Sequence, residues 1–328
     1  MALTPDFVKA HIQKWEAELA KPLHSYRSKW PSRLFHHSPI ENAVDIIKAG
    51  LLRSRNDPDN TNFKDVAAQG VIAAQNLAHG SVRLYFRPRT PTQWHIEGIR
   101  KASECAYGDA SHAPILIMFV FDAIKVLTTQ GVRFSDRNMQ SQHALLDDTE
   151  NHFSKVPFEK VFHEGSTAND ASIIQHRCAE VLATSPLQLE DNLQCIFCRT
   201  NAEREMLLFL LDDRAQKWQK KILVSDDNLV FERKYAFVRF VGVSREGLSF
   251  DLNPRLDNKT VSIAVEGWDE ANVKIVNYTS AEFNSRPANP NERWIFRRPL
   301  NDGTYRVKIT LEGKLAYENK LILRPTLV

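Results

Sequence analysis

Long apolar segments are missing from this chain of 328 residues. Its densest apolar run, residues 113–127, is interrupted by Asp122 and Lys125, whereas a membrane-spanning helix needs about 20 apolar residues. Residues 1–21 have the pattern of a charged amphipathic helix and lack the apolar core of a signal peptide. Internal repeats and low-complexity tracts are also missing. The sequence therefore predicts a protein without a membrane span, and we expect it to act in the cytoplasm.

Cysteine is scarce, with four residues in the whole chain. Cys195 and Cys198 have the CxxC spacing of a metal-ligand pair, but no second pair or nearby histidine completes a zinc site. Free cysteine is mostly buried in protein cores, so we favour core thiols in a reducing compartment over a zinc site.

The net charge is small as well, because the chain has 43 basic and 40 acidic residues. The excess is uneven, because residues 231–328 hold 16 basic and 12 acidic residues, against 27 and 28 in residues 1–230. The last part is therefore mildly basic, which permits an anionic partner without requiring one. Apolar residues at 43% and charged residues at 25% are typical of a globular protein.

Helix and strand patterns alternate over residues 1–230. Apolar residues recur at helical spacing over residues 6–19, and residues 94–106 also indicate a helix. Ser38, followed by Pro39, predicts the N-cap of a helix that ends at Gly50. Strands are predicted at residues 33–37, 83–86, 114–122 and 193–198.

Residues 140–176 are more polar and show weaker patterns than their surroundings. This length exceeds the usual connection between two elements. The segment is therefore either a functional loop or a stretch with short helices of its own.

Short strands separated by turns follow from Phe231 to the end of the chain, which predicts a small β-sandwich. Asp302-Gly303 and Glu312-Gly313 are dipeptides typical of hairpin turns. We therefore divide the chain into residues 1–230, with a helical extension at residues 1–30, and an accessory β-sandwich domain at residues 231–328. The predicted strands are residues 236–243, 248–252, 261–266, 273–278, 294–297, 305–311 and 315–323.

Four short segments place polar or aromatic side chains at the edges of predicted elements. Each has an ordinary explanation too, such as a structural histidine, core aromatics before a basic turn, or a polar turn. The segments are residues 35–38 (Phe-His-His-Ser), 85–91 (Tyr-Phe-Arg-Pro-Arg-Thr-Pro), 134–138 (Phe-Ser-Asp-Arg-Asn) and 177–182 (Arg-Cys-Ala-Glu-Val-Leu).

Glu180 is the carboxylate of the fourth segment, where apolar residues alternate as at the start of a strand. A buried carboxylate must be paired or hydrogen-bonded, or its charged form is costly. The ordinary explanation is an ion pair with Arg177 at a strand edge.

In this order and spacing, the four segments resemble the DarT family of ADP-ribosyltransferases, toxins that attach ADP-ribose to bases of nucleic acid. The family's aromatic-His segment and following helix match residues 35–51, with Pro39 where the family's second histidine stands. Its Tyr-Phe-x-Pro-Arg-x-Pro, Phe-Thr-Asp and Arg-x-Ala-Glu-Val-Leu segments match the other three. The resemblance covers residues 34–211. It implies an α+β fold with a PARP-like ADP-ribosyltransferase core of mixed β strands and helices, and NAD as the donor. From the cysteine and histidine spacing, we expect no metal.

One departure from the family pattern concerns an arginine pair on the helix before the Tyr-Phe strand. One of these arginines helps to hold the dinucleotide or the active-site loop in the family. Residues 65–77 contain no arginine here, and Gln75 or Asn76 falls nearest. Either Arg53, Arg55 or Arg83 replaces this arginine, or substrate and mechanism have diverged.

Cleavage of the bond between nicotinamide and ribose creates an oxocarbenium-like centre, which a facing carboxylate stabilises. Glu180 would supply that carboxylate and would also take the proton of the attacking base. His36 would hydrogen-bond the adenosine-side ribose, and aromatic rings would wall or stack on nicotinamide. The implied cofactor-binding residues are His36, Ser38, Asn42, Tyr85 and Phe86.

The acceptor base must be unpaired, since a base stacked in a duplex is out of reach of the chemistry. Arginines at the segment edges are candidates for phosphate or base contacts, namely Arg87, Arg89, Arg137 and Arg177. In this enzyme class the segment before the catalytic glutamate recognises the substrate. Part of the specificity should therefore lie within residues 140–176, in side chains such as His163, Asn169 and His176.

The sequence predicts an NAD-dependent mono-ADP-ribosyltransferase that modifies a base of single-stranded nucleic acid, with DNA favoured and RNA as the alternative. A toxin of this kind implies an antitoxin partner, such as a macrodomain hydrolase that removes the mark. A catalytically inactive nucleic-acid-binding module is the alternative from a different class, and the missing arginine motivates it. For the β domain we favour a binding role.

Overall fold

The computed structural model describes residues 2–21, 23–60, 76–225, 230–289 and 292–324. Contacts along the chain divide it into two compact units. The first unit holds Met1–His95, Ile117–Phe197 and Leu229–Phe231, and the second holds Ile96–Leu116, Cys198–Asn228 and Glu232–Val328. No helix in the described ranges is long and apolar enough to cross a membrane.

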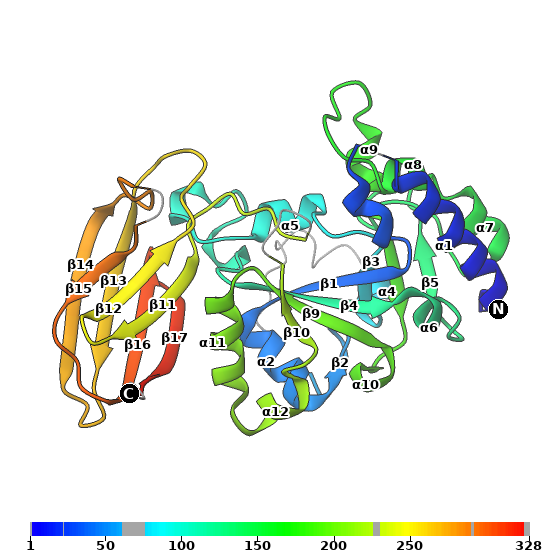
Figure 1. Ribbon diagram of the computed structural model, residues 1–328. Coiled ribbons are helices and arrows are strands. Elements are labelled where there is room, and N and C mark those ends of the chain that lie inside the picture. Colours follow the sequence, from blue (N-terminus) through cyan, green and yellow to red (C-terminus); the bar gives the residue numbers. More distant parts are fainter. Residues whose placement is uncertain (1, 22, 61–75, 226–229, 290–291, 325–328) are drawn as a thin grey trace. The chain divides into compact units, whose positions relative to one another are not determined.

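One sheet organises the first unit, and the strands of this sheet that the first unit contributes run in the order β9-β4-β1-β3-β7-β5-β6 (Figure 1). Residues 116–121 of β4 are all buried, which is expected for a strand covered on both faces. These strands are β1 (Arg33–Pro39), β3 (Val82–Tyr85), β4 (Leu116–Asp122), β5 (Arg133–Ser135), β6 (Leu146–Asp147), β7 (Glu180–Ala183) and β9 (Leu193–Cys198). A separate pair joins β2 (Leu51–Leu52) to β8 (Leu187–Gln188).

Helix α1 (Pro5–Leu19) confirms the helix predicted over residues 6–19. Helix α2 (Ile40–Ala49) confirms the predicted end, because Gly50 adopts a left-handed φ of 69°. The predicted N-cap was wrong: β1 continues through Ser38, Pro39 is the N-cap, and no side chain caps the helix. Pro39 can end the strand and start the helix because its ring fixes φ near the value that both need.

Residues 140–176 carry short helices of their own, which was one of the two expectations for this segment. The segment also includes β6. Among the residues that the structure describes, the first unit further holds the helices η1 (Ser25–Lys29), α4 (Asn76–His79), α5 (Pro91–Ile96), α6 (Ala123–Leu127), α7 (Glu150–Lys155), α8 (Phe158–Val161), α9 (Ser172–His176) and α10 (Leu189–Asn192).

The helix predicted over residues 94–106 was wrong, because α5 ends at Ile96. Gly98 has a φ of 100°, a left-handed conformation that a helix cannot contain. The chain then forms the short helices η2 (Ala102–Glu104) and η3 (Asp109–Ser111) of the second unit.

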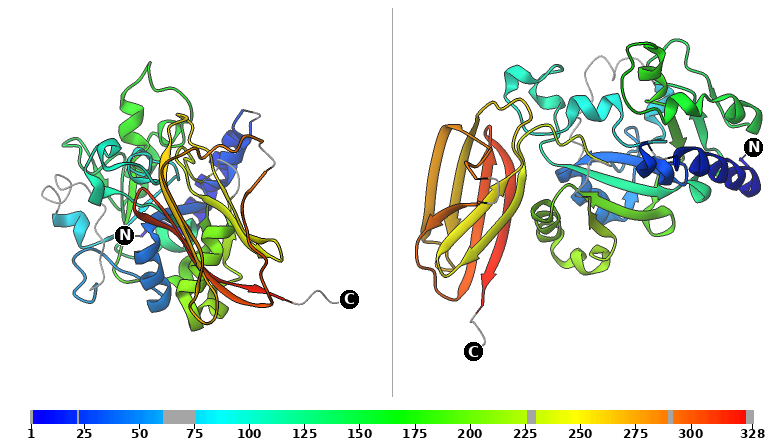
Figure 2. Two further views of the ribbon diagram at one scale, coloured as in Figure 1. Left: turned by 90° about the vertical axis from the view of Figure 1, so that its left-hand side faces the viewer. Right: turned by 45° about the horizontal axis from the view of Figure 1, so that its top comes forward.

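Seven antiparallel strands of the second unit form two sheets, in the orders β11-β12-β15 and β14-β13-β16-β17 (Figure 2). Aromatic rings fill the space between the sheets: Phe283 of β14 lies 6.2 Å from Phe250 and 5.0 Å from Trp294. The predicted β-sandwich is thus confirmed. The strands are β11 (Val238–Ser244), β12 (Gly247–Leu252), β13 (Val261–Trp268), β14 (Lys274–Phe283), β15 (Trp294–Arg297), β16 (Gly303–Leu311) and β17 (Lys314–Leu323).

The two predicted hairpin turns have different outcomes. Glu312 and Gly313 join β16 to β17, and both adopt positive φ, of 50° and 70°. The turn at Asp302-Gly303 was wrong, because β15 pairs with β12 and β16 pairs with β13 and β17.

Helix α11 (Asn201–Leu211) also belongs to the second unit and packs against β11 and β17. Its N-cap Thr200 accepts from the Glu203 N–H and donates to the Val238 carbonyl at 2.9 Å. These contacts join residues before 231 to the sandwich. The unit further includes η4 (Asp212–Arg214), α12 (Ala215–Trp218) and β10 (Ile222–Val224).

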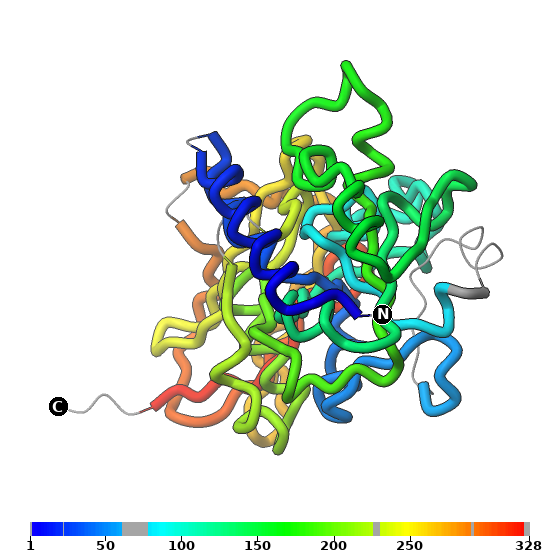
Figure 3. The backbone as a smooth tube through the Cα atoms, turned by 90° about the vertical axis from the view of Figure 1, so that its right-hand side faces the viewer, coloured from blue at the N-terminus to red at the C-terminus, as the bar shows by residue number. Residues whose placement is uncertain are grey.

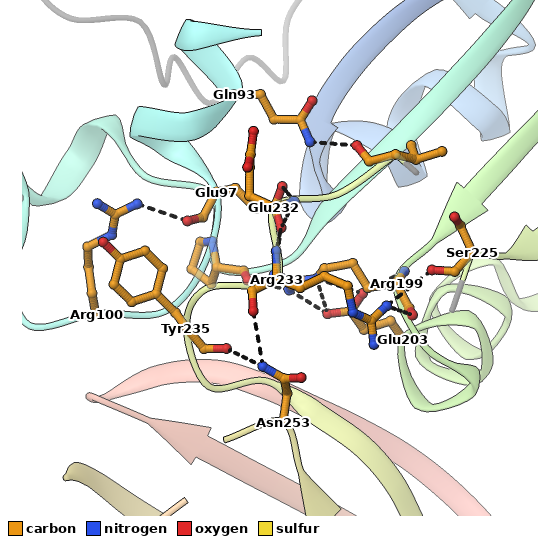
Figure 4. A network of polar contacts seen from close by, with 12 residues as sticks. Gln93, Glu97, Arg100, Arg199, Glu203, Ser225, Glu232, Arg233, Tyr235 and Asn253 are labelled. Carbon is orange, nitrogen blue, oxygen red and sulfur yellow. Dashed lines mark hydrogen bonds and ion pairs between the residues drawn. The ribbon is translucent and has the colours of Figure 1, made fainter. Parts of the chain in front are cut away.

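A buried ionic network supports the chain where the sandwich begins (Figure 4). Arg199 binds Glu203 through Nε at 2.9 Å and lies 3.7 Å from Glu97. The Glu97 carboxylate accepts the backbone N–H groups of Glu232 and Arg233. Burying these charges is tolerable because each is paired and hydrogen-bonded, so we interpret the network as structural.

Candidate active site

Glu180 begins β7 and is 1% exposed. The antiparallel register of β3 and β7 places Tyr85 opposite Glu180 and Arg83 opposite Leu182. The backbone N–H of Glu180 donates to Ser135 Oγ at 3.0 Å, and that hydroxyl donates to the carbonyl of Arg137. Ser135, from the segment that matches Phe-Thr-Asp, therefore fixes the backbone of the candidate catalytic residue.

Arg83 clamps the Glu180 carboxylate with two hydrogen bonds, Nε to Oε2 at 2.7 Å and Nη2 to Oε1 at 2.6 Å. Burial lowers the pKa of Arg83, but the adjacent Glu180 carboxylate outweighs this and raises that pKa above its ordinary value. The ion pair with Arg177, the ordinary explanation from the sequence, is not the contact that Glu180 makes. Arg177 is the C-cap of α9, and its guanidinium contacts His163 and Gly165.

His36 on β1 contacts Arg83 as well. Its Nδ1 lies 3.0 Å from the Arg83 carbonyl oxygen, which can only accept, so Nδ1 carries the proton. Burial is the main cause that lowers the pKa of His36, which keeps the ring neutral. The Nε2 lone pair is then the acceptor that the ring presents. Arg83 thus joins His36 and Glu180 through its carbonyl and its guanidinium.

His37 is a site residue that the sequence did not single out. Phe35 is opposite Tyr85, so alternation along β1 puts His37 on the same side of the sheet as Tyr85 and Glu180, and His36 on the other. The His37 ring is parallel to the Tyr85 ring at 5.4 Å. Burial lowers the pKa of His37 to about 3, so it is neutral. The sequence alone did not identify His37, because its position depends on the pairing register of β1, β3 and β7.

The other candidate cofactor residues, Ser38, Asn42 and Phe86, are all buried. Because β1 and β3 are antiparallel, Ser38 near the C-terminal end of β1 and Asn42 just beyond it lie at the opposite end of this strand pair from Phe86, which follows β3. Ser38 is 3% exposed and Asn42, in the first turn of α2, is 9% exposed. The Phe86 ring meets Phe153 and Phe158 edge-on, at 6.0 and 5.3 Å. Phe86 is therefore part of an aromatic core behind the site.

Helix α1 contributes to this core and lies beside α7 and α8 (Figures 1 and 3). His11 lies 4.8 Å from Phe153 and 4.3 Å from Phe158, and Trp15 lies 5.8 Å from Phe162. At the start of the helix, Thr4 Oγ1 donates to Glu150 Oε1 at 2.6 Å. The N-terminal helix therefore braces residues 149–162, within the segment expected to recognise the substrate.

The four candidate substrate arginines have different surroundings. Arg87 is 2% exposed and hydrogen-bonds Glu164 and the carbonyls of Val161 and His163. Arg89 Nη1 lies 3.5 Å from the same carboxylate. Arg137 instead pairs with its neighbour Asp136, through Nη2 at 2.8 Å.

The three candidate specificity residues are spread along residues 140–176. His176 is buried and donates from Nδ1 to the Asp136 carbonyl at 2.7 Å, which ties α9 to the end of β5. His163 is half-buried beside Arg177. Asn169 is exposed, on the connection between α8 and α9.

Cys178, Cys195 and Cys198 are buried free thiols, and Cys105 is half-buried. Across the described ranges, no group of three or more His, Cys, Asp or Glu side chains could hold a metal ion. On the side of the sheet that holds Glu180, the arrangement therefore offers a carboxylate clamped by a guanidinium, the neutral imidazole of His37 and a tyrosine, while the neutral imidazole of His36 lies on the other side.

A protein-family model described as "ssDNA thymidine ADP-ribosyltransferase, DarT" matches residues 35–231. No curated protein sequence matches the chain. Similar solved structures include Thermus sp. 2.9 DarT in complex with ADP-ribosylated ssDNA, at 16% identity, 60% of this chain, 95% of that chain and a TM-score of 0.49.

Two further solved structures are also similar to the chain. Thermus sp. 2.9 DarT in complex with NAD+ has 17% identity, covers 60% of this chain and 96% of that chain, and has a TM-score of 0.46. Thermosipho africanus DarTG in complex with ADP-ribose has 13% identity and a TM-score of 0.41. The match covers 67% of this chain and 55% of that chain. The family assignment rests on the sequence match to the family model.

Proposed function

The chain belongs to the DarT family of single-stranded-DNA thymidine ADP-ribosyltransferases, and from this membership we propose how its own residues transfer ADP-ribose. The enzyme is an NAD-dependent ADP-ribosyltransferase that acts on single-stranded DNA. The observation that carries the proposed mechanism is the buried Glu180 carboxylate, held by Arg83 through two hydrogen bonds.

In the proposed reaction, the bond between nicotinamide and the ribose C1′ breaks and nicotinamide leaves with the bonding electrons. The oxocarbenium-like centre that forms is stabilised by the facing Glu180 carboxylate. A nitrogen of the unpaired target base attacks C1′, and Glu180 accepts the proton that this nitrogen loses. The products are nicotinamide and an ADP-ribosylated base.

Arg83 is our candidate for the arginine that the family carries on the preceding helix. Arg53 binds Asp57 and Asp59, at 3.0 and 3.3 Å, whereas Arg83 binds the candidate catalytic carboxylate itself. Gln75 lies outside the described residues, and so does most of the 65–77 stretch. A guanidinium here would hold Glu180 in one rotamer and balance its charge before NAD binds.

For NAD, we propose that neutral His36 accepts a hydroxyl of the adenosine-side ribose at Nε2. Ser38 and Asn42 would add polar contacts where α2 begins, and Tyr85 would wall the nicotinamide. Phe86 would act from behind, by supporting Tyr85 through the aromatic core.

For DNA, we propose that Arg89, Arg137 and Arg177 face the strand, while Arg87 holds the segment that carries His163 and Glu164. Guanidinium groups suit phosphate oxygens because their donors match the geometry of these acceptors. Residues 140–176 would then select the target base. The family's description favours thymidine in DNA over the RNA alternative.

The domain assignment and the partners are also proposals. We propose that residues 1–230 form the catalytic domain and that residues 231–328 form an accessory domain that aids binding. The contacts of α11 with β11 and β17 lie within the second unit, so residues 201–211 would be held by the accessory domain. An antitoxin, such as a macrodomain hydrolase, is the expected partner, and we propose that the enzyme acts in the cytoplasm.

Incubation with NAD labelled in its ADP-ribose part tests the function. Label should appear on a single-stranded DNA oligonucleotide that contains thymidine, and on neither the same sequence without thymidine nor the matching duplex. Label on the RNA of equivalent sequence alone would support the RNA alternative. Label on none of these acceptors would support the inactive binding module.

A further inference from the structure

Four guanidinium groups converge on one short segment of the first unit, residues 161–165. Arg27 Nη1 donates to the Phe162 carbonyl at 2.6 Å, and Arg177 Nη2 donates to the Gly165 carbonyl at 2.8 Å. Arg87 binds the Glu164 carboxylate and the Val161 and His163 carbonyls, and Arg89 lies 3.5 Å from the same carboxylate. We refer to Arg27, Arg87, Arg89 and Arg177 as the arginine cluster.

The arginine cluster and Glu164 together carry three positive charges in excess. Burial raises the pKa of Glu164, but Arg87, Arg89 and Arg177 outweigh this and lower that pKa, so its carboxyl is ionised. His163, beside the cluster, adds no further charge. Its pKa is lowered by burial and by the positive charges of Arg177, Arg87 and Arg27. An excess of this size in a partly buried place favours an anionic ligand.

The members of the cluster differ in exposure. Arg87 is buried and its guanidinium lies over the Trp30 ring, 4.7 Å from its centroid, so it is a structural support. The Arg89 side chain is 23% exposed, and Arg27 and Arg177 are half-buried. The side chains of Arg27, Arg89 and Arg177 are therefore partly exposed, whereas that of Arg87 is not.

The cluster lies at the end of the sheet that holds the candidate catalytic residue. β3 ends at Tyr85 and β7 begins at Glu180, and these two residues are opposite each other. Arg87 and Arg89 follow Tyr85, and Arg177 precedes Glu180 by three residues. The chain therefore leaves β3 and enters β7 at the same end of these two strands. An attacking base must also reach Glu180 at this end. Beside it, the connection between α8 and α9 projects from the unit, in green at the top of Figure 3.

Arg27 enters this cluster from the N-terminal extension, in η1, outside the residues that match the family. We propose that the three partly exposed members of the arginine cluster, Arg27, Arg89 and Arg177, bind a phosphodiester group of the single-stranded DNA next to the target base, with Arg87 holding the segment beneath them. The proposal rests on the proposed function for the identity of the polymer. Guanidinium groups bind phosphate oxygens with paired donors, and each contact releases condensed cations from the strand.

The test compares Arg27→Gln with Lys29→Gln in the full chain. Lys29 lies in the same short helix, is exposed and carries the same charge, so it is a matched control. Binding of a fluorescein-labelled, thymidine-containing single-stranded oligonucleotide is measured by anisotropy without NAD, over a range of KCl concentrations. We expect Arg27→Gln to weaken binding about tenfold and to reduce the salt slope by about 0.7, the value for one phosphate contact on a single strand.

The control should keep the wild-type affinity and slope, and Arg27→Lys should keep most of the slope because it keeps the charge. Michaelis constants distinguish a DNA phosphodiester from the NAD pyrophosphate as the ligand. Arg27→Gln should raise the Michaelis constant for DNA and leave the Michaelis constant for NAD unchanged. A wild-type salt slope in Arg27→Gln would overturn the proposal. A rise confined to the Michaelis constant for NAD would assign the cluster to the NAD pyrophosphate and would also overturn it. The anisotropy arm needs no turnover, so a failure of the transfer reaction itself would be seen separately as absent labelling in the wild-type protein.

Discussion

Arg83 and Glu180 meet across β3 and β7 through two parallel hydrogen bonds, of 2.7 and 2.6 Å. The Glu180 carboxylate is almost fully buried, and the Arg83 side chain is 25% exposed, on the solvent side of the pair. A buried carboxylate that loses its cation keeps the cost of desolvation. The pair therefore links the chemistry of the site to the stability of the fold.

Replacing Arg83 by Gln should reduce the rate of DNA labelling by roughly 100-fold to 1,000-fold, the usual effect of removing one electrostatic contact to a reacting group. Arg83→Lys should recover part of this rate, because it restores the charge without the two-pronged geometry. The initial rate of label transfer at saturating NAD checks this. Arg33→Gln, on β1, is the control, and an Arg83→Gln rate equal to that of the control would contradict the assignment.

The same pair predicts a non-additive effect on stability. Arg83→Gln alone should lower the melting temperature clearly, because the Glu180 carboxylate is then buried without a partner. Adding Glu180→Gln to that variant should raise the melting temperature again, because a neutral amide replaces the unpaired charge. Thermal unfolding of the two single variants and the double variant measures the coupling. Strictly additive shifts would indicate that the two side chains do not interact.

The adjacent histidines should differ in their effects on NAD. His36→Ala removes the ring whose Nδ1 donates to the Arg83 carbonyl, and it should raise the Michaelis constant for NAD. His37→Ala removes the ring parallel to Tyr85, and it should lower the turnover number more than it changes that constant. Steady-state kinetics with varied NAD and saturating DNA separate the two. If His37→Ala instead raised the Michaelis constant for NAD and His36→Ala mainly lowered the turnover number, the NAD contact would be assigned to His37 and not to His36.

Stability should fall in mild acid because of His11. Burial, and secondarily Lys14, lowers the pKa of His11 to about 3 in the folded protein. Between about pH 6.5 and 3 the unfolded chain therefore holds a proton on His11 that the folded chain lacks. As the pH decreases through this range, the free energy of unfolding decreases by at most about 1.4 kcal/mol per pH unit. Above about pH 6.5 the ring is neutral in both states and contributes no pH dependence.

His11→Phe keeps the ring contacts with Phe153 and Phe158 and removes the titrating group. The drop in melting temperature between pH 7.5 and pH 5 should therefore be smaller in this variant than in the wild-type protein. His143→Phe, at an exposed position, should leave the drop unchanged. Equal drops in all three proteins would show that His11 is not held neutral by the fold.

The brace formed by α1 should affect DNA more than NAD. Trp15 lies 6.0 Å from Phe158 and 5.8 Å from Phe162, and such ring contacts contribute about 0.5–1.5 kcal/mol each. Trp15→Ala should raise the Michaelis constant for DNA by up to about tenfold and leave that for NAD unchanged. Trp15→Phe should restore most of the loss. Equal rises for both substrates would indicate a general loss of folding.

Local patterns in the sequence were sufficient for many elements. Helix α1 follows from apolar spacing over residues 6–19, and the end of α2 follows from Gly50, because only a left-handed residue fits there. The strands of the sandwich follow from alternation, which is visible in the strictly alternating burial of β13. The Glu180 stretch was recognisable by its composition and its match to the family.

Pairings between distant segments were beyond the reach of the sequence. Arg83 and Glu180 are 97 residues apart, and their contact depends on the register of β3 against β7. The same register made His37, and not only His36, part of the site. Asp302-Gly303 has the residues of a hairpin turn, but the strands on its two sides belong to different sheets. Residues 94–106 do not form one helix, because Gly98 is left-handed and its N–H donates to the distant Ala113 carbonyl at 3.0 Å, a contact that local propensity does not encode.

The rate of label transfer from NAD to a thymidine-containing single strand in Glu180→Gln tests the central claim most directly. The substitution keeps the size of the side chain and removes its charge and its basicity, so the rate should fall by at least about 100-fold. Asp45→Asn, at an exposed position on α2, should keep the wild-type rate, and both variants should bind the unlabelled oligonucleotide with wild-type affinity. Transfer by folded Glu180→Gln at the wild-type rate would contradict the assignment of Glu180 as the catalytic residue.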